Sequence, residues 1–234
     1  MELLFQAVVF VGLLIGAGLS LYLRAQRRLD FVTFAANLGF RYSRSDPFGL
    51  PSLPFRLFTR GVGRRADNVA WGSWQGTPIT VFDFAYYEEV RNPTNWWWKH
   101  RVSRRFSCAM VEVADAAFPR LRVFPEGFLS RLADHVGFSD IEMESEEFNR
   151  RYQVLASERR FAYELIDARM VRWFLALERP VSFEVVGKWI LAYHERVRPR
   201  RLLPLIGSVA GFRERLPRVA LSLYGIGGKE ERES

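Results

Sequence analysis

The segment Gly61–Ala66 has the spacing G-x-G-x-x-A that dinucleotide-binding loops use to approach a pyrophosphate. Asp83 follows 20 residues after Gly63, where such folds place a carboxylate for the ribose. This chemistry requires a helix directly after the loop, because the helix N-terminus holds the phosphates. Residues 68–74 instead have a strand pattern interrupted by Gly72. We therefore predict a turn between two strands here and no nucleotide site.

Histidine, cysteine and acidic residues give no pattern typical of a catalytic or metal site. His100, His135 and His194 are far apart and show no H-E-x-x-H spacing. Cys108 is the single cysteine, so no internal disulfide forms, and its place in a strand pattern favours a buried thiol over a nucleophile. The acidic segment 140–147 lacks the glycine and the alternation of a calcium loop, so a solvated surface is expected. We assign no catalytic, cofactor or metal residue.

An aromatic and basic loop is the most informative feature after the N-terminal segment. It contains Trp96, Trp97, Trp98, Lys99 and Arg101. Indole rings suit the headgroup zone of a membrane, and neighbouring cations suit anionic lipid, so we interpret these residues as candidates for membrane contact. The same rings are also suited to packing on the domain, to a protein partner or to stacking on single-stranded nucleic acid. Nucleic acid is the least favoured partner, since the basic residues are spread along the chain and form no stripe.

In the first half of the chain, the elements that position these residues are mostly strands. Strands are predicted over 40–43, 54–60, 68–74, 78–87, 102–113 and 121–124. Gln75-Gly76-Thr77 has the residues of a hairpin turn. In the arm that follows, Phe82, Phe84 and Tyr86 share one face, which we expect to be the core face. The pattern indicates an antiparallel meander.

The second half of the chain is more helical. Helices are predicted over 125–135, 157–166 and 167–177, a strand over 152–156, and a hairpin from 180–186 and 189–193. Apolar residues from Leu205 to Leu223 follow a heptad, and Pro217 divides it into two shorter helices. These helices either close the core or lie on the membrane surface. The fold class is α+β: an N-terminal transmembrane helix followed by a mostly antiparallel sheet covered by helices.

The N-terminal stretch Leu3–Leu23 carries no charged residue. At 1.5 Å per residue it extends roughly 30 Å, the thickness of the hydrocarbon core of a bilayer. A cleaved signal peptide requires a basic start and a small-residue cleavage site, and neither is present, so we predict a retained transmembrane helix. Helical spacing continues from residue 25 to Gly39, which is typical of a juxtamembrane helix ending at a glycine.

Charge predicts the orientation of this helix. Arg24, Arg27 and Arg28 follow the apolar stretch directly, and such clusters stay in the cytoplasm. The N-terminus is therefore expected outside, and the domain in the cytoplasm of a single-pass cell-membrane protein. The net charge of +8 fits a domain beside an anionic leaflet.

The apolar helix also carries a stripe of small residues, Gly12, Gly16 and Ser20, at successive four-residue intervals. Such a stripe lets two helices approach closely, so these residues are candidates for association with a second copy or with a protein partner. A plain anchor is the alternative. The predicted organisation is a transmembrane helix (1–23), a juxtamembrane helix (24–39), a cytoplasmic α+β domain (40–224) and a flexible tail (225–234).

Two short motifs, Phe82-Asp83-Phe84-Ala85-Tyr86 and Glu147-Phe148-Asn149-Arg150-Arg151-Tyr152, together with the order of the parts, carry a resemblance. The chain resembles a group of bacterial single-span, membrane-anchored proteins of unknown function, which gives no activity to transfer. We expect a membrane-anchored binding or scaffolding domain with the lipid bilayer as its partner. A lipid- or small-ligand-binding sensor is the alternative and needs a cavity. An enzyme whose site the sequence does not reveal comes third.

Overall fold

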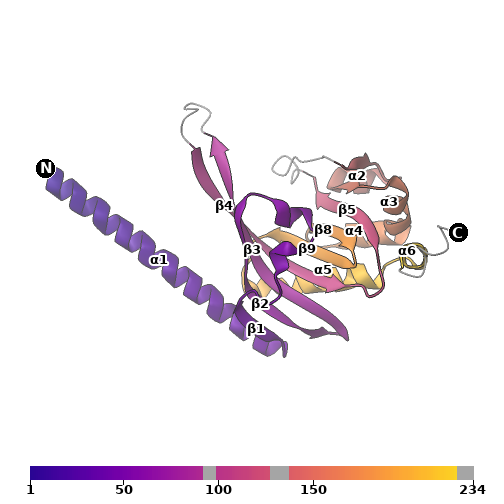
Figure 1. Cartoon of the computed structure of the whole chain (residues 1–234), viewed down its shortest axis with the longest axis horizontal. Coiled ribbons are helices and arrows are strands. Elements are labelled where there is room, and N and C mark those ends of the chain that lie inside the picture. The colour runs from indigo at the N-terminus through magenta and orange to yellow at the C-terminus, as the bar shows by residue number, and fades with distance from the viewer. Residues whose placement is uncertain (92–98, 127–136, 226–234) are drawn as a thin grey trace.

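In the part of the chain that the computed structural model describes, residues 1–91, 99–126 and 137–225, nine antiparallel strands form one sheet (Figure 1). The strands are β1 (Arg41–Ser45), β2 (Val62–Trp74), β3 (Thr77–Arg91), β4 (Lys99–Glu112), β5 (Phe118–Pro125), β6 (Ser139–Ile141), β7 (Tyr152–Ala156), β8 (Ser182–Gly187) and β9 (Trp189–Glu195). Their order in the sheet is β1-β2-β3-β4-β9-β8-β5-β7-β6. The helices are α1 (Glu2–Asn37), α2 (Glu146–Arg151), α3 (Arg159–Leu165), α4 (Ala168–Ala176), α5 (Leu202–Glu214) and α6 (Arg218–Tyr224). This arrangement confirms the predicted α+β class.

The β2–β3 hairpin forms where the turn residues predicted it. Gln75 and Gly76 have φ angles of 50° and 81°, and Trp74 pairs with Thr77. Two successive positive φ angles are the requirement of the two-residue turn that matches strand twist, and glycine meets it without steric cost. The meander therefore runs from β1 to β4, but the strand predicted over 121–124 does not continue it, because β9 lies beside β4 and β5 lies between β8 and β7.

Both faces of the sheet are buried, which corrects the expectation of a single core face. Phe82 and Phe84 are fully buried on one face, under the loop that contains the short 3₁₀ helices η1 (Leu50–Ser52) and η2 (Arg56–Thr59). Val81, on the other face, is equally buried and belongs to the cluster that includes residues of α1 and α5. A sheet covered on both sides needs apolar side chains at successive positions, so an alternating pattern does not reveal it.

The predicted strand over 54–60 is wrong, because these residues form η2 and its flanks. The backbone N–H groups of Arg56 and Leu57 donate to the carboxylate of Glu184, at 2.6 Å and 3.2 Å. A side chain thus satisfies donors that a strand would give to a neighbouring strand. The segment instead turns sharply and places Phe55 and Phe58 on the sheet.

Helices α3 and α4 follow the boundaries predicted for 157–166 and 167–177 closely, whereas α2 was not predicted. Asp167 caps α4 by accepting a hydrogen bond from the backbone of Met170 at 2.8 Å. Pro217 separates α5 from α6, as predicted. Leu205 and Val209 of α5 are buried, so α5 closes the core, which is the first of the two alternatives for this segment. The predicted helix over 125–135 falls almost wholly outside the described residues, as does the tail after residue 225.

α1 is one helix of 36 residues that leaves the domain at an angle (Figure 1). Every side chain described between residues 5 and 26 is exposed, and this part is long and apolar enough to cross a membrane. Arg27, Phe31 and Ala35 are then buried at successive turns. One helix therefore has an apolar half that no other part of the domain covers and a second half that packs on the sheet.

Candidate functional site

The junction between α1 and the sheet is a buried ion pair. The Arg27 guanidinium donates from Nε to Oδ2 of Asp83 at 2.9 Å and from Nη2 to Oδ1 at 2.5 Å. Only 8% of Arg27 is exposed. Its Nη1 donates to the carbonyl of Val197, and Nη2 also reaches Oγ of Ser107 at 3.3 Å. A two-point pair of this kind fixes both the position and the rotation of the helix that carries the arginine.

Asp83 is the centre of this network. Its Oδ2 also accepts a hydrogen bond from Nδ2 of Asn68 at 3.1 Å and lies 3.7 Å from Nε of Arg196. Asn68 has a φ of 51° and sits at an irregularity in the pairing of β2 with β3. The Asp83 carboxylate, whose spacing suggested a ribose contact, therefore already contacts Arg27, Asn68 and Arg196, which belong to three other segments.

The glycine-rich segment at the start of β2 serves close packing. A Cβ at Gly61 would lie 2.4 Å from the ring of Tyr86 and from the carbonyl of Tyr87. No helix follows Gly63, since Val62–Trp74 is already β2. The predicted turn between two strands is therefore wrong: η2 precedes the segment, only Arg60 and Gly61 separate η2 from β2, and Gly61 and Gly63 allow the chain to pass close to Tyr86 and Tyr87 of β3.

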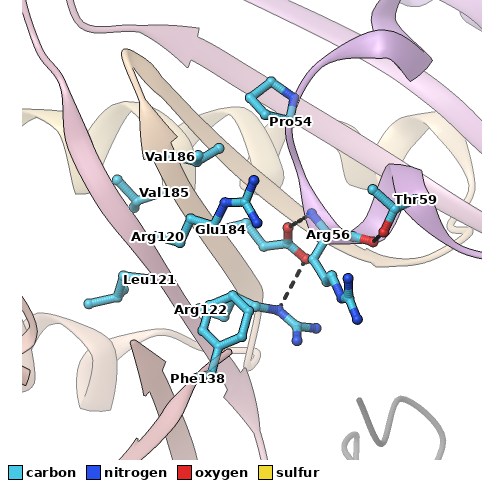
Figure 2. A pocket seen from close by; sticks show the side chains of 10 residues that line it. All are labelled: Pro54, Arg56, Thr59, Arg120, Leu121, Arg122, Phe138, Glu184, Val185 and Val186. Atoms are coloured by element: carbon cyan, nitrogen blue, oxygen red, sulfur yellow. Dashed lines mark hydrogen bonds and ion pairs between the residues drawn. The ribbon is translucent and has the colours of Figure 1, made fainter. Parts of the chain in front are cut away.

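A second buried ion pair lies on the opposite face of the sheet (Figure 2). Oε1 of Glu184 lies 3.4 Å from Nε of Arg122 and accepts a hydrogen bond from the hydroxyl of Tyr193 at 3.0 Å. Each of these three residues is at most 2% exposed. Burial raises the pKa of Tyr193 well above its usual value, so this hydroxyl stays protonated and donates.

A cavity of about 80 Å³ adjoins this pair, between the η2 loop and strands β5 and β8 (Figure 2). Ligand pockets usually measure roughly 300–1,000 Å³, so this cavity does not hold an acyl chain. A second depression of about 570 Å³ is open to solvent and is lined by residues 51–54 with Phe58, Gly63 and Arg64. Neither is the enclosed space between sheet and helices that the sensor alternative requires.

Cys108 is buried within β4, and burial raises the pKa of its thiol well above the usual value, as expected for an unreactive cysteine. Across residues 1–91, 99–126 and 137–225, no three His, Cys, Asp or Glu side chains are placed to hold a metal ion together.

The comparisons concern the fold. No protein-family model matches this chain, and no curated protein matches it. Its architecture is nevertheless found in a solved structure. The chain shares its fold with a mycobacterial transport factor. The crystal structure of the mycobacterial trehalose monomycolate transport factor A, TtfA, superposes with a TM-score of 0.57 at 14% identity, covering 81% of this chain and 93% of that chain.

The predicted membrane-contact residues belong in sequence to the segment that follows β3 and includes the first residues of β4. Trp96, Trp97 and Trp98 fall outside the described residues, and Lys99 opens β4 opposite Arg91. Arg101 is exposed and pairs with Glu89 at 3.4 Å. Figure 1 shows the β3–β4 hairpin and α1 rising from the domain on the same side.

The stripe of Gly12, Gly16 and Ser20 lies on the exposed part of α1. Gly16 and Arg27 are eleven residues apart, which at 100° per residue brings them to within about 20° around the helix. The stripe therefore points to the same side of α1 as the domain. A second copy packed against this side would meet the domain itself.

Sequence reasoning missed both buried pairs. In the sequence, Arg27 is one of several arginines after the span, and Asp83 stands out only by its spacing from Gly63. Glu184 and Arg122 carried a usable signal: each is a charged residue inside a short apolar strand, where a buried charge requires a partner. The sequence does not show which partner each one has.

Proposed function

We propose that this chain is a single-pass membrane protein whose domain binds or scaffolds other components, without catalysis, in lipid handling at the membrane. The observation that carries this proposal is the continuity of α1 from its exposed apolar half to the Arg27–Asp83 pair. A flexible linker is enough to retain a domain at a membrane. A helix fixed by an ion pair and by the packing of Phe31 gives the domain one orientation relative to the span, which suits a scaffold.

The fold of TtfA supports the lipid-related part of the proposal, since that protein is a transport factor for trehalose monomycolate. The cavity of about 80 Å³ favours a domain that positions other components over one that carries a lipid inside. We place the domain in the cytoplasm because Arg24 and Arg28 flank the span at the end that leads into the domain. A C-terminal reporter that is active only outside the cytoplasm should give no signal.

The test of the scaffold is recovery of its partners from the intact protein. The full chain is purified in a gentle detergent, and bound proteins and lipids are identified. We expect a membrane protein and lipid to be recovered with the native chain, and the protein to be lost from a D83N variant, in which α1 is held less firmly. E112Q, which removes a carboxylate from an exposed pair, is the matched control. Equal recovery from D83N would remove the argument for a fixed orientation.

Membrane contact by the tryptophan loop is a separate part of the proposal. Replacing Trp96, Trp97 and Trp98 with serine should weaken the interaction of the hairpin with the bilayer, because indole rings partition into the headgroup zone. Quenching of tryptophan fluorescence by brominated lipid in reconstituted full-length protein measures this, with W71F and W74F as controls for other rings. Quenching that survives the triple replacement would indicate that Trp96, Trp97 and Trp98 pack on the domain and do not contact the bilayer.

A further part of the proposal is that the stripe of Gly12, Gly16 and Ser20 binds a partner helix. Because Gly16 faces the side of the domain, we favour a span from another protein over a second copy. Self-association of the full chain in membranes should be the same in G16I and in G18I, which changes the opposite side of the helix. Loss of self-association in G16I alone would show that two copies pair through the stripe and that α1 bends before Arg27.

A further inference from the structure

The surface at the base of the span gathers arginines from three separate elements. α1 meets β3 where Arg27 binds Asp83, and Arg24 lies one turn nearer the membrane. On β3, Ala85 lies two residues after Asp83 and therefore on the same face of the sheet. Ala85 pairs with Arg65 of β2 on one side and with Arg105 of β4 on the other. Cross-strand partners share a face, so both arginines lie on the face that α1 crosses.

Tyr87, two residues further along β3, lies among these arginines. Nη1 of Arg65 lies 3.5 Å from its hydroxyl, and the guanidinium carbon lies 5.8 Å from the centre of its ring. The pKa of Tyr87 is lowered chiefly by the hydrogen bond and the charge of Arg65, with Arg105 and Arg24 adding to the effect. Three guanidinium groups therefore act on the hydroxyl of one half-buried tyrosine.

The charge of this surface is only partly compensated. Arg65 pairs with Asp67 at 2.9 Å, and Asp83 is already bound by Arg27. Arg105 contacts the neutral Ser103 hydroxyl at 3.2 Å. Arg24 and Arg105 are exposed. A cluster of this composition attracts an anion, and guanidinium groups match the oxygen geometry of a phosphate.

The position of the cluster along α1 indicates which anion it meets. Arg24 directly follows the apolar stretch that ends at Leu23. The ends of such a stretch lie at the level of the lipid headgroups. We propose that Arg24, Arg65 and Arg105, arranged around Tyr87, form a binding site for the phosphate of an anionic phospholipid headgroup. This inference rests on the proposed membrane placement of α1 and names the lipid chemistry that the domain would recognise.

The test uses the full chain in detergent micelles, titrated with dioctanoyl phosphatidylglycerol, dioctanoyl phosphatidylcholine or inorganic phosphate, with bound ligand counted by native mass spectrometry. Phosphatidylglycerol should bind and phosphatidylcholine should not. The R65Q/R105Q variant should lose at least about tenfold in affinity, since each charged hydrogen bond contributes to holding the headgroup. The control R159Q/R172Q removes the same charge from α3 and α4, at the far end of the domain, and should bind normally (Figure 1).

Thermal unfolding of both double variants establishes that they are folded. Normal phosphatidylglycerol binding by R65Q/R105Q, or equal binding of phosphatidylcholine, would overturn the proposal. Competition by inorganic phosphate at the affinity of the lipid would overturn the lipid assignment in favour of a free anion. Membrane fractionation of the same variants separates this failure from failure of the proposed function, which predicts that every variant remains in the membrane.

Discussion

Among the residues that the structure describes, each face of the sheet buries an arginine–carboxylate pair, and the two pairs are built differently. On one face, Asp83 of β3 binds Arg27, which belongs to a helix that also leaves the domain. On the other face, Arg122 of β5 and Glu184 of β8 are direct neighbours in adjacent strands. Glu184 also accepts hydrogen bonds from two backbone N–H groups of the η2 loop. The first pair joins a separate element to the sheet, and the second joins the sheet to its own loop.

The difference decides what happens when a partner is lost. A buried charge without a partner is costly, and a pair is therefore most sensitive where neither member can reach water. Arg122 lies within the sheet and is only 2% exposed. Arg27 sits on α1, so the end of the helix can lift and expose the guanidinium. We expect loss of the Glu184 carboxylate to destabilise the whole domain and loss of the Asp83 carboxylate to release α1.

The largest effect is expected for Glu184→Gln. The change leaves Arg122 as an uncompensated buried charge, which costs about 3–5 kcal/mol of unfolding free energy. Chemical denaturation of the full chain in detergent measures it. The double variant E184Q/R122M should recover much of the loss, because it removes the buried charge as well. A loss below about 1 kcal/mol in E184Q would contradict the view that this pair is internal to the fold.

Asp83→Asn should have a smaller and more local effect. We expect a loss of about 2 kcal/mol, below the cost of a fully trapped charge, because Arg27 reaches solvent when α1 lifts. Hydrogen exchange should rise in residues 27–37 and in β1, while β7 and β8 keep their protection. Equal loss of protection in β7 and β8 would show that the two pairs do not differ in the way proposed.

The local elements of the fold could be predicted from the sequence because their causes are local. Gln75 and Gly76 specify a turn, Asp167 specifies a helix start, and Pro217 specifies a break, each through its own backbone preference or hydrogen bond. The exposed half of α1 follows from composition alone. These are the parts in which prediction and structure agree.

The site could not be predicted because its contacts join distant segments. Arg27 and Asp83 are 56 residues apart, and η2 forms because Glu184, 128 residues after Arg56, satisfies its backbone. An alternating pattern predicts a strand at residues 54–60 unless that distant acceptor is known. The burial of both sheet faces likewise depends on α1, α5 and the η2 loop, which the pattern of β3 does not contain.

The smallest effect is expected at the exposed pair of Glu112 and Lys188, which serves as the reference for both buried pairs. Their charged atoms are 2.6 Å apart, closer than those of Arg122 and Glu184, yet about half of each side chain is exposed. Water and salt already stabilise both charges, so Glu112→Gln should cost less than about 0.5 kcal/mol. Lys188 also keeps its contact with the ring of Trp189, at 5.1 Å. The same denaturation measurement applies, and raising the salt concentration should shrink the effect further. A loss comparable to that of E184Q would mean that separation, and not burial, sets the strength of these pairs.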